Sequence, residues 1–296
     1  MNKWRYIIAL FSVFIYLMAF DFNPELATNF SYSVIILGLL IIGIPHGAID
    51  HLLQKDKKQL LFKFILKYLI IVVIYFLTWQ YFPLLSLIVF ILYSSFHFGE
   101  SELQEIDIHM VSIWSYFRAL FLGLSILLFI IFTHSNESLQ IVSQLSGYDF
   151  ENTFKEIFIS SRLYIILLSI VFIVWQIIIT KKRSLIALIM LLLIGTQVPL
   201  MFAFSLYFIG QHSYNAWMHI KHSLSISFLS LYKNASPFTL GALFIFVAIY
   251  FYGKFNLEYL KSLSSHFFIF LACISLPHFI LMHLFYKKNS NYFPNF

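Results

Sequence analysis

The chain has 296 residues, of which 60% are hydrophobic and only 11% are charged. A soluble domain carries about 25% charged residues, so a soluble globular protein is excluded and an integral membrane protein is predicted. The net charge of +6 does not indicate nucleic-acid binding, because the lysines and arginines gather between apolar runs, as in cytoplasmic loops. With Cys273 as its single cysteine, the chain has neither a disulfide framework nor a thiolate metal cluster.

Membrane-spanning helices need about 20 mostly apolar residues each. The sequence predicts an all-α fold, a polytopic membrane helix bundle of about ten transmembrane helices, in one integral membrane domain over residues 1–296. In chain order the predicted helices cover residues 4–20, 32–53, 62–80, 83–99, 111–132, 162–180, 184–197, 199–222, 237–253 and 266–286. The first run lacks a clear cleavage site and is interpreted as a retained helix.

Two stretches decide the helix boundaries. Residues 184–222 are too long for one span, and Gly195 and Pro199 bracket a predicted turn, because proline disfavours helix at the residue before it. With this break, the lysine-rich ends of the runs all fall on one side, which is expected to be cytoplasmic. The longest polar stretch, 133–161, is expected to form a loop with a short surface helix.

Four histidines, His46, His97, His212 and His278, lie in or at the end of apolar runs. A titratable ring is costly in lipid, so each marks a candidate functional site. His46, His212 and His278 each precede a lysine of the expected cytoplasmic side by nine residues, which is about 13 Å on a helix. The four rings are therefore expected at a similar depth, where they could meet as ligands of a transition metal.

The stretch around His46 also has simpler readings. A single membrane histidine can hydrogen-bond a neighbouring helix, and Pro45-His46-Gly47 can be only a kink. Asp50, one turn later, is expected either to orient the ring of His46 or to be an acid at a helix end. His51 is about 140° around the helix from His46, so it is a candidate for support of the site and not for a shared ion.

The second motif, His97-Phe98-Gly99-Glu100, can be a helix terminus with Gly99 near the cap. Glu100 either hydrogen-bonds a ligand or is merely solvated. His283 follows His278 by five residues and is expected to face elsewhere.

Histidine ligation without cysteine suits iron, copper or zinc, and iron held by imidazoles leaves open positions for dioxygen. Haem is a rival, because it also takes histidines from facing helices. The paired histidines of a desaturase-like di-iron protein have a counterpart only in His219 and His222. A transporter that relays protons or carries metal through buried histidines is an alternative of another class.

Several motifs together resemble the Brp/Blh family of bacterial β-carotene 15,15′-dioxygenases in order and approximate spacing. They are Gly43-Ile44-Pro45-His46-Gly47-Ala48-Ile49-Asp50-His51, His97-Phe98-Gly99-Glu100, His212-Ser213 and Pro277-His278. The resemblance implies an enzyme of the bacterial inner membrane that uses Fe²⁺ and O₂ to cleave the central double bond of β-carotene into two all-trans-retinal molecules. It also implies His46, His97 and His212 as iron ligands, and a rhodopsin as the typical acceptor of retinal. A member that only binds carotenoid or retinal is the alternative.

The fourth ligand stays open, because typical members have His-Ser-x-x-His and this chain has Ala216 at the second histidine position. His219 is the nearest substitute, but seven residues separate it from His212, about 10.5 Å along a regular helix. His278 comes from another helix at matching depth and is the predicted ligand. A π-bulge or an unwound turn near Asn215 would be needed to bring His219 in, and a water molecule or an open coordination position could replace both histidines.

Overall fold

The computed structural model describes residues 4–53, 60–182, 184–256 and 263–290, which are helical apart from short turns. In chain order the elements are α1 (Trp4–Phe22), α2 (Pro24–Gly38), the π-helix η1 (Leu39–Gly43), α3 (Ile44–Ala48), the 3₁₀ helix η2 (Asp50–Leu53), α4 (Leu60–Tyr81), α5 (Pro83–Glu105), α6 (Ile113–Thr133), α7 (Ser135–Ser146), α8 (Phe150–Thr180), α9 (Ser184–Gly195), α10 (Leu200–Tyr207), the π-helix η3 (Phe208–Ser213), α11 (Tyr214–Leu224), α12 (Phe228–Asn256) and α13 (Leu263–Ser290). These ranges contain no strand, so the predicted all-α fold is confirmed.

Eight helices within the described ranges are long and apolar enough to cross a membrane, which confirms the predicted polytopic bundle. Two of the ten predicted spans differ from the rest. α9 has only 12 residues, and residues 200–224 are divided into α10, η3 and α11. The predicted break is present, because α9 ends at Gly195 and α10 begins after Pro199.

The short helix expected within residues 133–161 is present as α7, but the expected loop is reduced to a tight turn, because α8 already begins at Phe150. Gly147 ends α7 with a φ of 73°, a left-handed conformation that glycine adopts without steric cost. The Asp149 carboxylate accepts a hydrogen bond from the backbone N–H of Asn152 at 3.0 Å and caps the start of α8. Because the two caps follow each other so closely, only a tight turn separates the helices.

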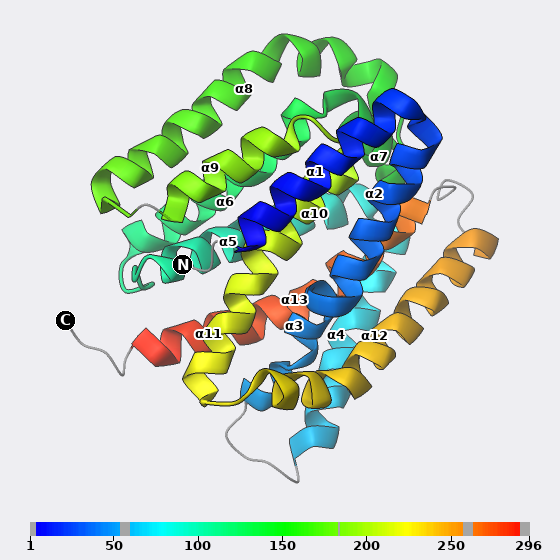
Figure 1. Cartoon of the computed structure of the whole chain (residues 1–296). Helices are drawn as coiled ribbons and strands as arrows, with labels where there is room; N and C mark the ends of the chain where they lie inside the picture. The colour runs from blue at the N-terminus through cyan, green and yellow to red at the C-terminus, as the bar shows by residue number, and fades with distance from the viewer. Residues whose placement is uncertain (1–3, 54–59, 183, 257–262, 291–296) are drawn as a thin grey trace.

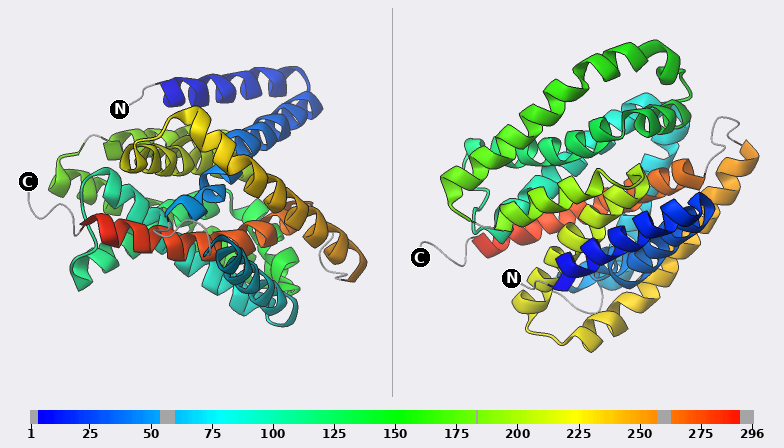
Figure 2. Two further views of the ribbon diagram at one scale, coloured as in Figure 1. Left: turned by 90° about the horizontal axis from the view of Figure 1, so that it is seen from below. Right: turned by 45° about the horizontal axis from the view of Figure 1, so that its top comes forward.

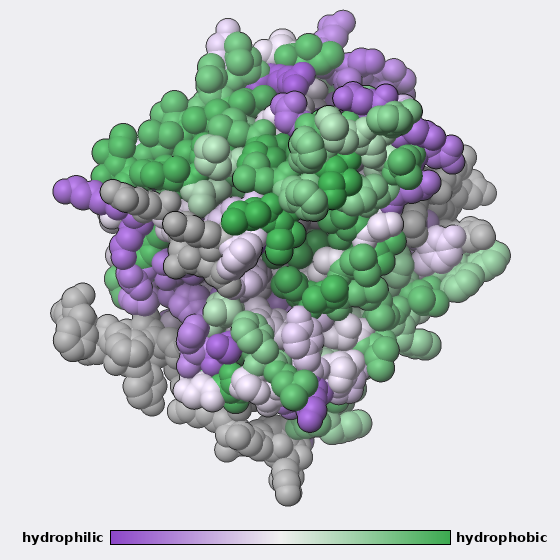
Figure 3. Space-filling view, in the orientation of Figure 1, coloured by the Kyte–Doolittle hydropathy of each residue, from purple (hydrophilic) through white to green (hydrophobic). Residues whose placement is uncertain are grey.

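α5 and α13 lie at the centre of the packing. α5 packs on α6, α4 and α13, while α13 also packs on α4 and α12. Figures 1 and 2 show α6, α8 and α9 grouped at one side of the molecule and α12 at the other. Hydrophobic residues cover α8, α1 and α12 on the face shown in Figure 3, as expected for helices that face lipid. His97 on α5 and His278 on α13 are thereby placed in the interior.

α5 and α6 approach each other closely at two glycines. A Cβ added to Gly99 would lie 1.7 Å from the carbonyl oxygen of Ala119, and one added to Gly123 would lie 1.6 Å from that of Ser95. Small residues allow such close backbone contact between membrane helices. The reading of Gly99 as a helix cap is wrong, because α5 continues to Glu105.

Replacing Gly99 with alanine should lower the thermal stability of the purified protein in detergent, because the new methyl group must push the α6 backbone away. Overpacking costs about 1–3 kcal/mol, and a clash with backbone places this variant near the upper end. Gly241→Ala is the matched control, since a Cβ there meets no atom within 4 Å. Equal melting temperatures for the two variants would contradict the close contact.

Candidate metal centre

Two π-helical segments position His46 and His212. η1 ends directly before α3, which carries His46, and η3 contains His212. A π-turn shifts the register of the side chains that follow it, and such turns are frequent at functional sites. η1 and η3 pack against each other, and the ring centroids of the two histidines lie 5.5 Å apart. The local helix geometry therefore turns both rings toward each other in the interior.

The rings of His46, His212 and His278 form one cluster, in which ligand nitrogens from all three lie within 4.8 Å of one another. The ring of His278, from α13, has its centroid 4.8 Å from that of His46. His97, from α5, lies beside this group, with its ring centroid 4.7 Å from His212 and 5.2 Å from His278. The structure thus gathers the four histidines singled out in the sequence, three of them in the closest group.

The nitrogens of this cluster fit a bound metal cation. The four side chains are between 1% and 4% exposed. Among the described residues, Nε2 of His46 and His278 and both ring nitrogens of His97 and His212 have no hydrogen-bond partner. Buried polar atoms without partners cost free energy, and neutral imidazole nitrogens are good ligands for transition metals. A metal ion would satisfy them.

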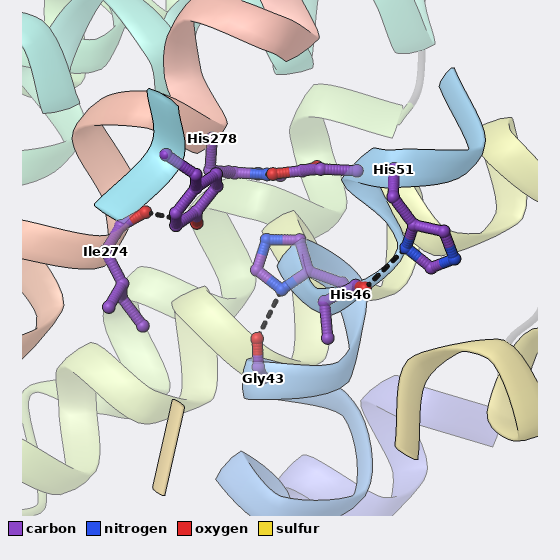
Figure 4. Close-up of polar contacts among 8 residues, drawn as sticks. Gly43, His46, His51, Ile274 and His278 are labelled. Carbon is purple, nitrogen blue, oxygen red and sulfur yellow. Dashed lines mark hydrogen bonds and ion pairs between the residues drawn. The ribbon is translucent and has the colours of Figure 1, made fainter. Parts of the chain in front are cut away.

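Asp50 orients His278 and not His46. Its two carboxylate oxygens accept hydrogen bonds from Nδ1 of His278 at 2.8 and 3.0 Å, and both side chains are buried. The expectation that Asp50 holds the ring of His46 is wrong, since Nδ1 of His46 donates to the backbone carbonyl of Gly43 (Figure 4). The reason lies in the backbone, because α3 ends at Ala48 and Asp50 begins a 3₁₀ turn. In both histidines the Nδ1 hydrogen bond leaves Nε2 available for a metal.

Asp50→Asn should weaken metal binding, because the carboxylate accepts the hydrogen bond that orients the ring of His278. Changes to such partners of a ligand typically cost about 10–100-fold in metal affinity. Metal titration of the purified variant measures the loss. Asp21→Asn, at an exposed carboxylate on α1, is the control. An affinity unchanged by Asp50→Asn would show that this pair does not serve the metal.

His51 and Glu100 hydrogen-bond other groups than the four rings. Nδ1 of His51 donates to the backbone carbonyl of Ala48 at 3.2 Å (Figure 4). Glu100 accepts a hydrogen bond from Nδ1 of His283 at 2.7 Å. His51 lines the cavity beside the cluster, but neither of these two hydrogen bonds orients a candidate ligand.

His219 stays outside the cluster. Its ring packs against Tyr286, with centroids 5.8 Å apart. The π-segment that would be needed near Asn215 lies earlier, because η3 ends at Ser213 and a regular α-helix follows. Ala216 is fully buried in a separate apolar cluster. At the position where typical members have the second histidine, this chain therefore has a residue that packs in the apolar interior and cannot bind a metal.

Sequence reasoning missed a buried polar network beside His212. Gln211 donates from Nε2 to the Glu102 carboxylate at 2.9 Å and accepts from the hydroxyl of Tyr6 at 2.7 Å. Arg5 donates to the same hydroxyl at 2.7 Å. The network ties α1 and α5 to η3. Its only signal in the sequence is that Glu102 and Gln211 adjoin apolar runs, where unpaired polar groups would be costly.

An apolar cavity of about 600 Å³ lies against the histidine cluster. The four histidines line it together with a few other polar residues, namely Asp50, His51, Ser94 and Ser275, and most of the remaining lining residues are Phe, Leu, Ile, Ala and Tyr. The hydroxyl of Tyr68 donates to the carbonyl of Ile274 at 2.8 Å, and that of Tyr93 donates to the carbonyl of Ala272 at 2.7 Å. Because both hydroxyls already donate hydrogen bonds to backbone carbonyls, these tyrosines present mainly their aromatic rings to the cavity. The cavity suits a large apolar molecule beside the candidate metal site.

These features define an integral membrane protein whose candidate histidine metal site lies against an apolar cavity. The family model described as β-carotene 15,15′-dioxygenase matches residues 37–286, a range that includes all four histidines. The chain therefore belongs to the β-carotene 15,15′-dioxygenase family, and the resemblance carried by the sequence motifs is confirmed. The family name implies a dioxygenase with a carotenoid substrate. No curated protein and no solved structure matches the chain.

Proposed function

We propose that this chain is an Fe²⁺-dependent dioxygenase that cleaves the central double bond of β-carotene with O₂ and gives two all-trans-retinal molecules. The observation that carries the proposal is a buried histidine cluster in the wall of an apolar cavity, in a chain of this dioxygenase family. The reaction replaces one carbon–carbon double bond with two carbonyl groups, and both oxygen atoms of O₂ enter the products. It needs a redox-active metal beside a site that accepts a hydrocarbon.

In this proposal His46, His212 and His278 hold the iron, with His97 as the fourth ligand. Bound iron would supply the binding and activation of dioxygen, because ligation by imidazoles leaves coordination positions open. The chain holds protons on the outer nitrogens of two rings. Gly43 accepts from Nδ1 of His46, and Asp50 accepts from Nδ1 of His278. In the neutral form of each ring these contacts place the proton on Nδ1, so that Nε2 would offer its lone pair to the iron.

The apolar wall selects the substrate by shape. A hydrocarbon that enters from lipid gains little hydrophobic free energy, since lipid tails are as apolar as the protein interior. Packing against the rings that line the cavity must therefore decide which molecule binds and which bond reaches the histidines. Asp50 is the only carboxylate among the described residues that line the cavity, and its pairing with His278 leaves the wall suited to an uncharged polyene.

We further propose that the chain works in the inner membrane of a bacterial cell and that its retinal passes to a rhodopsin. The resemblance of the motifs to the Brp/Blh family supports both parts, and the apolar spans support a membrane location. Coexpression with a retinal-free rhodopsin, followed by the appearance of its pigment colour, is the direct measurement.

Expression in cells that make β-carotene tests the proposed activity. The cells should lose β-carotene and accumulate retinal, and the purified chain should contain stoichiometric iron. β-Carotene that copurifies uncleaved with an iron-loaded chain would instead favour a carotenoid-binding protein. A chain that holds no stoichiometric metal and leaves β-carotene intact would favour a histidine-based metal or proton transporter.

A further inference from the structure

The cavity has a mouth on the outer surface of the bundle, between α4 and α12. Four of its lining residues are exposed, namely Leu69 on α4 and Pro237, Gly241 and Phe244 on α12. All its other lining residues are buried or half-buried. Leu69 is 40% exposed and Phe244 is 75% exposed. The open end of the cavity therefore lies at these two helices, and the histidine cluster lies in the buried wall.

Packed contacts bound this mouth. α4 packs on α5 and α13, whereas α12 packs on α3 and α13, and Figures 1 and 2 show both helices along the same side of the molecule. The two helices meet beyond the mouth, where the rings of Phe76 and Tyr252 lie 5.5 Å apart. On the inner side, Phe238 of α12 stacks on His51 with centroids 4.2 Å apart. The packing of α4 and α12 on their neighbours, and the ring contacts at either end of the mouth, therefore fix the positions of the two helices that border it.

Gly241 lines this mouth, and because it has no side chain it does not narrow the opening. It is exposed, and a Cβ added to it would meet no atom within 4 Å. Pro237, Gly241 and Phe244 recur at helical spacing, so they share one face of α12. In contrast to Gly99, no neighbouring backbone requires a glycine at this position. What Gly241 contributes is the absence of side-chain volume.

The chemistry of the mouth suits a hydrocarbon. Its four exposed residues are leucine, proline, glycine and phenylalanine, and both helices belong to apolar spans. An opening between two such spans faces the hydrocarbon layer of the bilayer and not water. None of these four residues offers a charged or polar side chain to a solute.

We propose that the gap between α4 and α12 is the lateral entrance through which the carotenoid passes from the membrane into the cavity, and that Gly241 keeps this entrance open. The inference rests on the proposed function and adds the route and the residue that controls it. A large side chain at Gly241 fills the passage without disturbing the packed interior. It therefore slows access to the histidines while leaving them in place.

The test measures uptake in the absence of oxygen, so that passage is separated from cleavage. Full-length wild type, Gly241→Trp and Leu240→Trp are purified with their metal and mixed anaerobically with phospholipid vesicles that contain β-carotene. The proteins are captured at intervals, bound carotenoid is read by absorbance, and oxygen is then admitted to measure retinal. Leu240 is the matched control, because it is 67% exposed but does not line the cavity. Gly241→Trp should slow uptake by about tenfold or more, the effect of a modest steric barrier.

Slow uptake by Gly241→Trp alone, at an unchanged melting temperature, supports the entrance. Equal uptake by all three proteins, or equal slowing in both tryptophan variants, would overturn it. Uptake by wild type that yields no retinal with oxygen would overturn the dioxygenase proposal and leave the entrance standing. If no protein takes up carotenoid, both proposals fail.

Discussion

Replacement of His46, His97 or His212 singly with alanine should abolish retinal formation in cells that make β-carotene, while the chain still inserts in the membrane. Each change removes a nitrogen expected to bind iron. The ring nitrogens of His97 and His212 have no hydrogen-bond partner among the described residues, so their loss leaves no group newly unpaired. His46 gives up only its bond to the Gly43 carbonyl. The cost to folding should therefore be small beside the loss of activity.

Retinal and β-carotene in cell extracts, the amount of protein in the membrane fraction, and iron in the purified variants are the three readouts. His222→Ala is the control, because His222 is exposed on α11. It should retain both iron and activity. Full activity in the three cluster variants would mean that these histidines are packing residues and would remove the basis of the iron site.

The apolar runs and the turn residues were enough to predict much of the bundle. Pro199 marks a break that the structure contains, because proline has the same local effect in any fold. In the polar stretch 133–161 the short helix was expected, but the start of α8 at Phe150 was not, because the first turns of α8 are polar and do not belong to an apolar run. Gly99 looked like a cap in the sequence. Its role depends on the approach of α6, which no local pattern reveals.

The site was predictable in residue type and depth but not in partners. The equal spacing of His46, His212 and His278 from lysines predicted a common depth, and their rings do meet. The partner of Asp50 was misjudged, because the regular helix assumed there gives way to a 3₁₀ turn. The π-helical segments η1 and η3 could not be predicted from the sequence either. One extra residue in a helical turn leaves almost no trace in the hydrophobic pattern of an already apolar run.

His278→Ala should lower iron occupancy far more than His219→Ala, although His219 is nearer in sequence to the position of Ala216. His278 contributes one nitrogen to the group of ligand nitrogens that lie within 4.8 Å of one another. The ring of His219 packs against Tyr286, two turns or about 10.5 Å beyond His212 along the chain. Metal–nitrogen bonds are only about 2.0–2.1 Å long, as known for zinc, so His219 cannot reach the site without breaking α11.

A second variant separates loss of the ligand from loss of the Asp50 pair. His278→Ala leaves the buried Asp50 carboxylate without its donor, and breaking a buried pair costs about 3–5 kcal/mol in stability. His278→Asn keeps an N–H near the position of Nδ1 to donate to Asp50, but it has no atom equivalent to Nε2. Iron measured in both purified variants should fall alike if His278 is the ligand, whereas His219→Ala should keep the iron content of wild type. Iron retained by His278→Asn and lost by His219→Ala would make His219 the ligand and would require α11 to unwind.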